Sequence, residues 1–371
     1  MVLPIVNATV MSILNATLGK QEVQESNLSL FGRRYGKVHG YVSILVCIFG
    51  VISNILNAIV LTRRHMTTPT NYIMTALAVA DCLKMLTYPV YAIYSFFYKQ
   101  DGLDANHSQG WMYYMVVQNI FNTTCHNMAM WLTVSLAVFR YIFVCHHGIV
   151  NRLCSLQRAL LTIKIIVIAN AIVCIPDIFL YRVVKPTDFG LNISGYVIAN
   201  SRLVVKHNFY KTFNYWFFAV IMKVVPCILL TLLSAIVILA MHQASKRRVR
   251  LLQQTRPSDH NVNRKHNRTT WMLVSVVLFS VITEMPHGIL IMVSGLNKDF
   301  HIEVYSKLGD IKDLLLLLNS SLNFVLYSIM SKKFRDTFKK LFVVNSMCHK
   351  HNETGRHNVC VISTNTEVTT L

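Results

Sequence analysis

The sequence predicts an all-α fold in which seven helices span a membrane and a short amphipathic helix follows on the membrane surface. The first indication is composition, because 53% of the residues are hydrophobic and only 14% are charged, whereas soluble domains carry roughly 25% charged residues. The second is a series of seven apolar stretches, each near or above the roughly 20 residues that cross a bilayer. The third is the basic, amphipathic segment directly after the last of them.

In chain order, the predicted spans are Val38–Leu61, Tyr72–Phe97, Trp111–Val144, Ala159–Leu180, Phe213–Met241, Trp271–Leu296 and Val304–Met330. The third and fifth are longer than a bilayer requires, so we expect them to project beyond it. The predicted regions are an N-terminal segment (1–37), the seven-span domain (38–330), a surface helix (331–343) and a disordered tail (344–371).

Basic residues orient these spans. Dense clusters occur at Arg63-Arg64, Lys246–Arg250 and Lys332-Lys333, and short basic loops normally stay on the cytoplasmic side. We therefore expect a plasma-membrane protein with its N-terminus outside and its C-terminus inside. The net charge of +20 would then face anionic lipid and a cytosolic partner. Nucleic acid is disfavoured as a partner, because the charge is divided among loops between spans.

Candidate modification sites agree with this orientation. The glycosylation sequons of the outer segments are at Asn7, Asn15, Asn27, Asn106 and Asn192. All nine cysteines lie in spans or on the inner side, so no extracellular disulfide is expected. Cys348, shortly after the surface helix, is a palmitoylation candidate. Thr369-Thr370-Leu371 could add as a strand to a PDZ domain, and the alternative is an inert tail.

The last span carries polar groups at bilayer depth, at helical spacings that place them near one side: Asp313, Asn319, Asn323 and Tyr327. Such groups are expensive in lipid, so they usually face a bundle interior and serve a function. Directly after this span, basic residues alternate with Phe334, Phe338 and Phe342, as expected of a helix on an inner membrane surface. Together these features indicate a signalling membrane protein.

Polar and proline positions along the spans resemble rhodopsin-like G-protein-coupled receptors. The matching residues, in order, are Asn54, Asp81, Arg140, Tyr141, Pro226, Pro286, Asn319, Asn323 and Tyr327. Within that family the chain looks like insect myosuppressin and FMRFamide-like neuropeptide receptors. The phrases that carry this resemblance include Lys223-Val-Val-Pro-Cys227, Thr283-Glu-Met-Pro-His-Gly288 and Asn319-Ser-Ser-Leu-Asn-Phe.

The resemblance implies a cell-surface receptor, not an enzyme, for an amidated peptide that ends in Arg-Phe. It also implies signalling through a heterotrimeric G protein of the Gi/o class, inhibition of adenylate cyclase, binding of arrestin, and no cofactor. Three positions depart from the family pattern: Met115 replaces a cysteine, Phe139 replaces the acid before Arg140, and Glu284 replaces a tryptophan. The partner of the missing cysteine is absent too, so packing alone is expected to hold the second outer loop.

Arg140 and Asp81 are expected to change partners on activation. By resemblance, Arg140 is released to meet the C-terminal helix of the G protein, with a weak resting lock because of Phe139; the alternative is a snorkelling arginine. The amides expected to hydrogen-bond Asp81 are Asn54, Asn319 and Asn323. The resemblance implies a sodium ion there, but Ala129 stands where serine is common, which argues against a metal. The alternative is a satisfied structural polar cluster.

Lys223 and Glu284 precede Pro226 and Pro286 by three and two residues, at similar depth in adjacent spans. An isolated charge inside a bundle costs much more than a paired one. We therefore predict an ion pair that bridges the fifth and sixth helices; the alternative is separate solvation by pocket water.

Asp310 and Asp313 are neighbours on a helix, near the outer end of the last span. Such acids suit a cationic ligand group, arginine above all. We expect Asp313 to bind the peptide arginine with help from Asp310; the alternative is an exposed acid pair that counters Lys312. Further predicted pocket residues, for an aromatic ring and an amide, are Gln118, Phe121, Asn122, His126 and His287. Asn122 stands where amine receptors carry aspartate, which argues against an amine ligand.

Two other readings stay open. A rhodopsin-like receptor could bind a lipid or another small molecule, although the long basic second outer loop favours a peptide. A transporter would more often show inverted repeats, and an intramembrane enzyme would need a nucleophile with a base, or a set of metal ligands. The sequence shows neither pattern.

Overall fold

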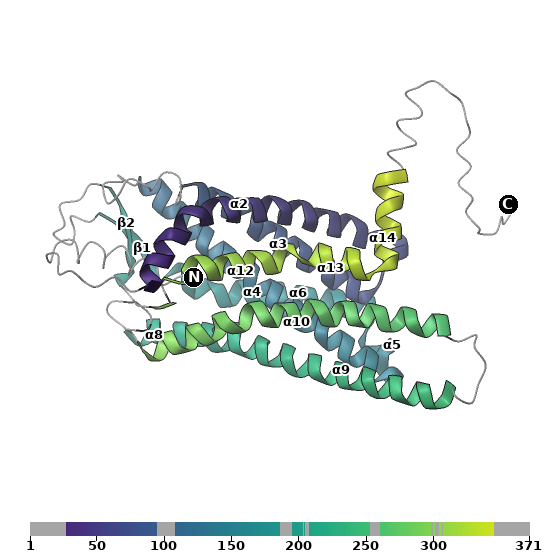
Figure 1. Cartoon of the computed structure of the whole chain (residues 1–371). Coiled ribbons are helices and arrows are strands. Elements are labelled where there is room, and N and C mark those ends of the chain that lie inside the picture. Colours follow the sequence, from purple (N-terminus) through teal and green to yellow (C-terminus); the bar gives the residue numbers. More distant parts are fainter. Residues whose placement is uncertain are drawn as a thin grey trace, which may run out of the picture.

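The computed structural model describes residues 27–94, 108–185, 195–202, 204, 208–252, 260–297, 300, 304–305 and 307–344. Over these residues the protein is a bundle of long helices with a β-hairpin at one end and a crossing helix at the other (Figure 1). The predicted all-α helical bundle is confirmed, and the small hairpin is an addition that the sequence did not indicate.

Within the described residues, six helices are long and apolar enough to cross a membrane. A seventh is added if Gly309–Ile329 and the bent helix that follows it, Lys332–Phe342, are counted as one span. The long helices are α2 (Asn27–Leu61), α3 (Pro69–Ile93), α4 (Gln109–Cys145), α6 (Leu156–Ile178), α9 (Val225–Leu252) and α10 (His260–Leu296). Short helical turns after α2 and α4 are η1 (Arg64–Met66), η3 (His147–Ile149) and α5 (Val150–Leu153).

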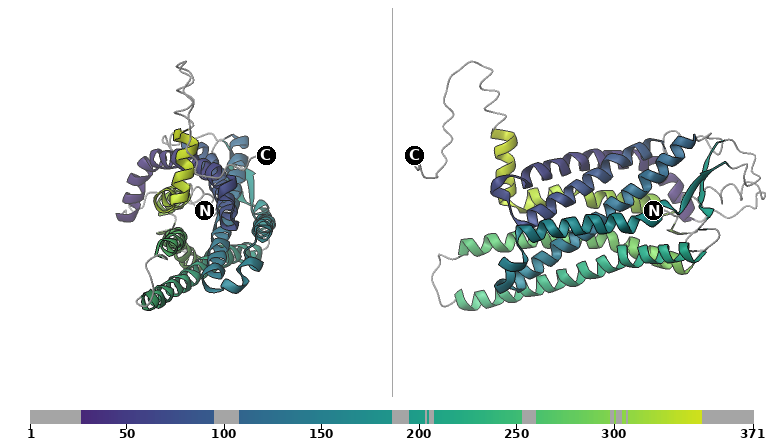
Figure 2. Two further views of the ribbon diagram at one scale, coloured as in Figure 1. Left: turned by 90° about the vertical axis from the view of Figure 1, so that its right-hand side faces the viewer. Right: turned by 180° about the vertical axis from the view of Figure 1, so that it is seen from behind.

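The fifth and seventh predicted spans are each built from several segments. The fifth consists of α8 (Asn208–Phe217), a π-helical segment η5 (Phe218–Val224) and α9. The seventh consists of α12 (Gly309–Ser321) and α13 (Asn323–Met330). After Ser331 the chain turns by 93° into α14 (Lys332–Phe338) and its continuation η8 (Lys339–Val344), which stand across the end of the bundle (Figure 2).

Two helices begin eleven residues earlier than their predicted spans. Helix α2 starts at Asn27, inside the segment expected to precede the bundle, and α10 starts at His260 rather than Trp271. Hydropathy marks only the part of a helix that lies in lipid, so it misses polar extensions of the same helix. On the side opposite the hairpin, α9 and α10 project beyond the other helices (Figure 1).

Hydroxyl side chains define where several helices begin. The hydroxyls of Thr68, Ser108, Ser155 and Ser331 accept hydrogen bonds from backbone N–H groups three residues later, at 3.2–3.4 Å. These contacts satisfy donors that the first turn of a helix leaves free. Pro69, at the start of α3, has no backbone N–H group that would need an acceptor.

The outer surface of the bundle is apolar, and its interior contains polar side chains among apolar ones. Large side chains such as Leu45, Ile168 and Ile282 are more than half exposed, whereas Asn54, Lys84 and Glu284 are at most 3% exposed. This arrangement suits a chain surrounded by lipid, where buried polar groups mark the interior of the bundle.

The hairpin covers the end of the bundle near the start of α4. Strands β1 (Tyr181–Val184) and β2 (Val197–Asn200) pair antiparallel, with Tyr181 opposite Asn200. Ile198 packs on Met112 and Met115 of α4. The described cysteines are all free thiols, and the hairpin contacts α4 through apolar side chains.

A charged cavity as candidate ligand-binding site

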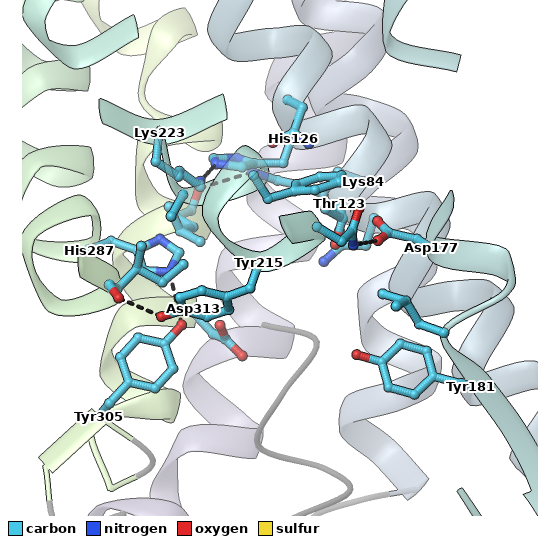
Figure 3. A pocket seen from close by; sticks show the side chains of 18 of the residues that line it. Lys84, Thr123, His126, Asp177, Tyr181, Tyr215, Lys223, His287, Tyr305 and Asp313 are labelled. Atoms are coloured by element: carbon cyan, nitrogen blue, oxygen red, sulfur yellow. Dashed lines mark hydrogen bonds between the residues drawn. The ribbon is translucent and has the colours of Figure 1, made fainter. Parts of the chain in front are cut away.

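A cavity of about 130 Å³ lies inside the bundle, near the hairpin. Side chains from α3, α4, α6, η5, α10 and α12 line it. Its charged lining residues are Lys84, Asp177, Lys223 and Asp313. The close view shows His287, Tyr305 and Asp313 on one side of the cavity and Asp177 and Tyr181 on the other (Figure 3).

The predicted contact between Lys223 and Glu284 is present. Lys223 Nζ lies 3.2 Å from Glu284 Oε2, and His126 Nε2 lies 3.3 Å from the same oxygen. Lys223 also donates to His126 Nε2. The group therefore joins three elements, α4, η5 and α10, rather than the two that the sequence indicated.

The π-helical segment explains how a lysine reaches this depth. Because Pro226 has no N–H, the backbone before it departs from the regular α pattern, and the N–H of Val225 donates to the carbonyl of Val220. The extra residue per turn places Lys223 on the inner face, where it is buried. Glu284 is fully buried, and its second carboxylate oxygen has no hydrogen-bond partner among the described residues.

Asp313 lies in the cavity wall with its carboxylate open to the space. Within the described part of the chain, no hydrogen bond or ion pair reaches it. The neighbouring Lys312 does not pair with it, because Lys312 Nζ lies 3.1 Å from the ring centroid of Tyr305. The alternative of an acid pair that counters Lys312 is therefore not what the structure shows.

An aromatic group lies beside Asp313. The rings of His287 and Tyr305 are stacked with centroids 6.4 Å apart, and Tyr305 Oη and His287 Nε2 are 3.5 Å apart. Tyr215 donates a hydrogen bond of 2.5 Å to the carbonyl of Ile291.

Three predicted pocket residues do not line the cavity. Asp310 points toward α2, where a methyl group added at Gly36 would lie 3.4 Å from its Oδ2, and it does not line the cavity. Phe121 is 39% exposed on the outer face of α4. Gln118 is buried without lining the cavity, whereas Asn122, His126 and His287 do line it.

Two charged residues of the cavity were missed by the sequence reasoning. Lys84 is buried on α3 and donates to the carbonyl of Leu316 at 3.1 Å and to the hydroxyl of Ser320. Asp177 is buried near the end of α6. Both residues could have been found from the sequence, because a charged residue inside an apolar span is a candidate functional residue by default.

The network expected around Asp81 is smaller than predicted. Asn323 donates to Asp81 Oδ2 at 3.1 Å, but the other two amides bind elsewhere. Asn54 donates to the carbonyls of Gly50 and Ser320, each at 2.9 Å, and Asn319 accepts from Ser280 at 3.3 Å. The cavity beside this group measures about 10 Å³, close to the smallest space that holds one water.

A second cavity, of about 320 Å³, lies at the α14 end of the bundle. Arg140 and Tyr327 line it and are both buried. The guanidinium of Arg140 lies 5.8 Å from the ring centroid of Phe143, and its Nε has no hydrogen-bond partner within the described residues. Phe139 packs into the adjacent core. No described carboxylate comes within 4 Å of Arg140, as the replacement of the preceding acid predicts.

Other predicted sites fall outside the residues that the structure describes. They are Asn7, Asn15, Asn106, Asn192, Cys348 and Thr369–Leu371. Asn27 opens α2, but its side chain is likewise outside the description. Among the described residues, no group of histidine, cysteine or acidic side chains could hold a metal ion.

Comparison with known proteins places the chain among membrane receptors. The chain is 28% identical over 356 residues to the G-protein coupled receptor dmsr-1 of Caenorhabditis elegans, covering 83% of this chain and 69% of that protein. It is 28% identical over 331 residues to the sex peptide receptor of Drosophila melanogaster, covering 85% and 75%. It is 23% identical over 314 residues to the Drosophila FMRFamide receptor, covering 82% and 54%.

Residues 41–345 match the model of a family described as serpentine type 7TM GPCR chemoreceptor Srw. The match extends over all the helices that line the two cavities, and it confirms the resemblance to rhodopsin-like receptors. The chain is therefore a multi-pass membrane receptor rather than an enzyme. It belongs to the seven-transmembrane G-protein-coupled receptor family.

Proposed function

We propose that this receptor binds an amidated neuropeptide of the FMRFamide or myosuppressin type through Asp313. The observation that carries the proposal is a carboxylate open to an internal cavity, with no cation within 4 Å among the described residues. An unpaired acid in such a place costs several kcal/mol, so a cationic ligand that pairs with it gains affinity. The names of two relatives, FMRFamide receptor and sex peptide receptor, support a peptide as the ligand class.

The chemistry of the wall favours arginine followed by an aromatic residue. Neither oxygen of Asp313 has a hydrogen-bond partner among the described residues, so a planar guanidinium can donate two parallel hydrogen bonds to them. The rings of His287 and Tyr305 form an aromatic surface next to it, against which a phenylalanine ring can pack in an offset arrangement. The side chain of Asn122 lies on the cavity wall, and its amide group is of the kind that can hydrogen-bond to a terminal amide.

We expect ligand binding to affect the G-protein side of the receptor through the charged residues at the bottom of the ligand cavity. Lys223, His126 and Glu284 connect α4, η5 and α10, so a ligand that draws Lys223 or His126 away alters how α10 is held. A displacement of α10 would open the cavity that contains Arg140, where the C-terminal helix of a G protein would bind. We propose Gi/o as the G-protein class, with arrestin as a further partner.

The remaining features of the proposal concern topology and modification. The N-terminus is placed outside by the basic loops on the opposite side, so the outer sequons would carry glycans, and Cys348 would carry a palmitoyl group. The end of the chain at Thr369-Thr370-Leu371 is proposed as a PDZ ligand. None of these features is needed for the binding of peptide at Asp313.

A signalling assay tests the ligand class. Cells expressing the receptor are treated with a panel of peptides ending in Arg-Phe-amide and with their free-acid forms, and cyclic AMP is measured with and without a toxin that blocks Gi/o. We expect a saturable decrease in cyclic AMP with the amides and no decrease after the toxin. If no peptide of the panel acts while the receptor is verified at the cell surface, the proposed ligand class is wrong.

A further inference from the structure

The cavity contains a second buried acid, across from Asp313, that the proposed binding mode does not use. Asp177 lies near the end of α6, directly after Pro176, and is only 3% exposed. Its side chain lines the same cavity as Asp313, and the close view shows the two acids on opposite sides of it (Figure 3).

One of the two carboxylate oxygens of Asp177 accepts a hydrogen bond from a described residue. Asn214 of α8 donates to Asp177 Oδ1 at 2.9 Å. Its other oxygen receives no hydrogen bond from the described residues, and no described lysine, arginine or histidine lies within 4 Å. One neutral hydrogen bond does not compensate a buried carboxylate, which normally needs a cation or several donors. The free oxygen is therefore a place where a ligand can contribute the missing charge.

The geometry favours one kind of cation. Asn214 already donates to Oδ1, so a guanidinium that donates to both oxygens would have to share Oδ1 with it. A compact ammonium, which donates along single directions, suits one free oxygen. Tyr181 and Phe218 line the cavity as well, and aromatic faces attract an ammonium.

We infer that Asp177 binds a primary ammonium of the ligand, specifically the N-terminal amine of a short peptide whose arginine is bound at Asp313. This inference rests on the proposed function, because it takes Asp313 as the arginine site. The ligand class is then a peptide with two cationic groups, recognised at opposite walls of one cavity. A peptide with a blocked N-terminus, or one whose N-terminus lies far from the arginine, loses this contact.

The test combines one receptor change with one ligand change. A tetrapeptide ending in Arg-Phe-amide and its N-acetylated form are compared on the wild-type receptor and on Asp177→Asn. Acetylation removes the charge of the amine, and Asp177→Asn removes the charge of the acid while keeping a group that can bond Asn214. Asp336→Asn, an exposed acid on α14, is the matched control, and surface expression is measured for each variant.

We expect acetylation to weaken the wild-type response at least about tenfold, and Asp177→Asn to weaken the response to the free-amine peptide to a similar degree. The two changes together should add little to either one alone. Full additivity, or an acetylated peptide as potent as its parent on the wild-type receptor, overturns the inference. The acetylation comparison needs no variant, so it decides the matter even if Asp177→Asn does not reach the surface.

Failure of this inference is distinguishable from failure of the proposed function. If neither form of the peptide activates the wild-type receptor, the proposed ligand class itself is wrong, and with it the premise of this inference. If both forms activate it equally and Asp313→Asn abolishes the response, the arginine site stands and Asp177 has no part in recognition.

Discussion

Glu284 shares one carboxylate oxygen between Lys223 and His126, at 3.2 and 3.3 Å. His126 Nε2 can accept from the ammonium or donate to the carboxylate, but not both at once, so its protonation state selects its partner. Removing one member of a buried ion pair typically costs about 3–5 kcal/mol, because the other charge is left uncompensated. This group is therefore a sensitive point between the ligand cavity and α10.

Reversing the two charges tests whether the pair acts as a unit. Lys223→Glu and Glu284→Lys, made singly, place two like charges at the cavity floor and should abolish signalling. The double variant restores opposite charges on η5 and α10 and should recover a measurable part of the response. G-protein activation is the readout, with surface expression as the control; no recovery in an expressed double variant would mean that the contact does not control signalling.

We propose that Phe139, which stands where an acid usually precedes Arg140, leaves this arginine weakly held in the resting state. The arginine is buried beside Phe143 with no described carboxylate within 4 Å. Introducing an acid by Phe139→Asp supplies a partner, which should lower basal G-protein activity and raise the ligand concentration needed for half-maximal response. Phe139→Asn, which has the same shape without the charge, is the control. Equal basal activity in both variants and the wild type would rule out this account of the arginine.

Helices α8 and α10 approach closely at Gly295. A methyl group added there would lie 2.6 Å from Tyr215 Cε1 and 3.2 Å from Trp216 Cζ2. Tyr215 lines the ligand cavity and donates to the carbonyl of Ile291 on α10. The absence of a side chain at residue 295 therefore fixes the position of a cavity residue.

We expect Gly295→Ala to displace the Tyr215 ring and to weaken ligand binding, since overpacking costs about 1–3 kcal/mol. Gly288→Ala on the same helix is the control, because an added methyl group would meet no atom within 4 Å. Saturation binding with a labelled peptide gives the two affinities. Equal affinities for the two variants would show that the contact at Gly295 does not shape the cavity.

The helices were predictable from the sequence because lipid imposes a simple length rule. Apolar runs located every span, and Ser331 ends the last one where the basic helix begins. The β-hairpin was not predictable, because its two strands are only four residues each. The π-helical segment was not predicted either, because a proline in an apolar span indicates that a helical hydrogen bond is missing but not how the backbone adjusts to its loss.

Near the cavity, the prediction succeeded where the charge of a residue alone indicated its partner, whichever face of the helix the residue occupies. Lys223 and Glu284 carry opposite charges at one depth beside prolines, so their contact followed from the cost of burying each alone. Asp310 and Phe121 were misplaced because a polar or aromatic residue on a helix fixes the depth but not the face. Asp177 was missed because it is a single charge without a motif.

The whole receptor has two functional ends joined by a polar interior. The ligand cavity lies near the hairpin, and Arg140 lines the second cavity near α14. The hairpin and α14 lie at opposite ends of the bundle (Figure 1). Between them, Lys84 donates to Leu316 and Ser320, and Asn323 donates to Asp81. A bundle whose interior is polar along its length can exchange hydrogen-bond partners with little loss of packing, which suits a protein that must switch between two states.

The recognition of a peptide arginine by Asp313 is the central claim, and a cycle of one ligand change and one receptor change tests it most directly. Potency is measured for an Arg-Phe-amide peptide and for its citrulline analogue, which has nearly the same shape without the charge, on the wild-type receptor and on Asp313→Asn. Asp310→Asn, in which the altered acid faces α2, is the control. If Asp313 binds the arginine, each change alone should weaken the response by at least about thirtyfold, and the second should then add almost nothing. Independent, additive losses, or a citrulline analogue as potent as its parent on the wild-type receptor, would contradict it.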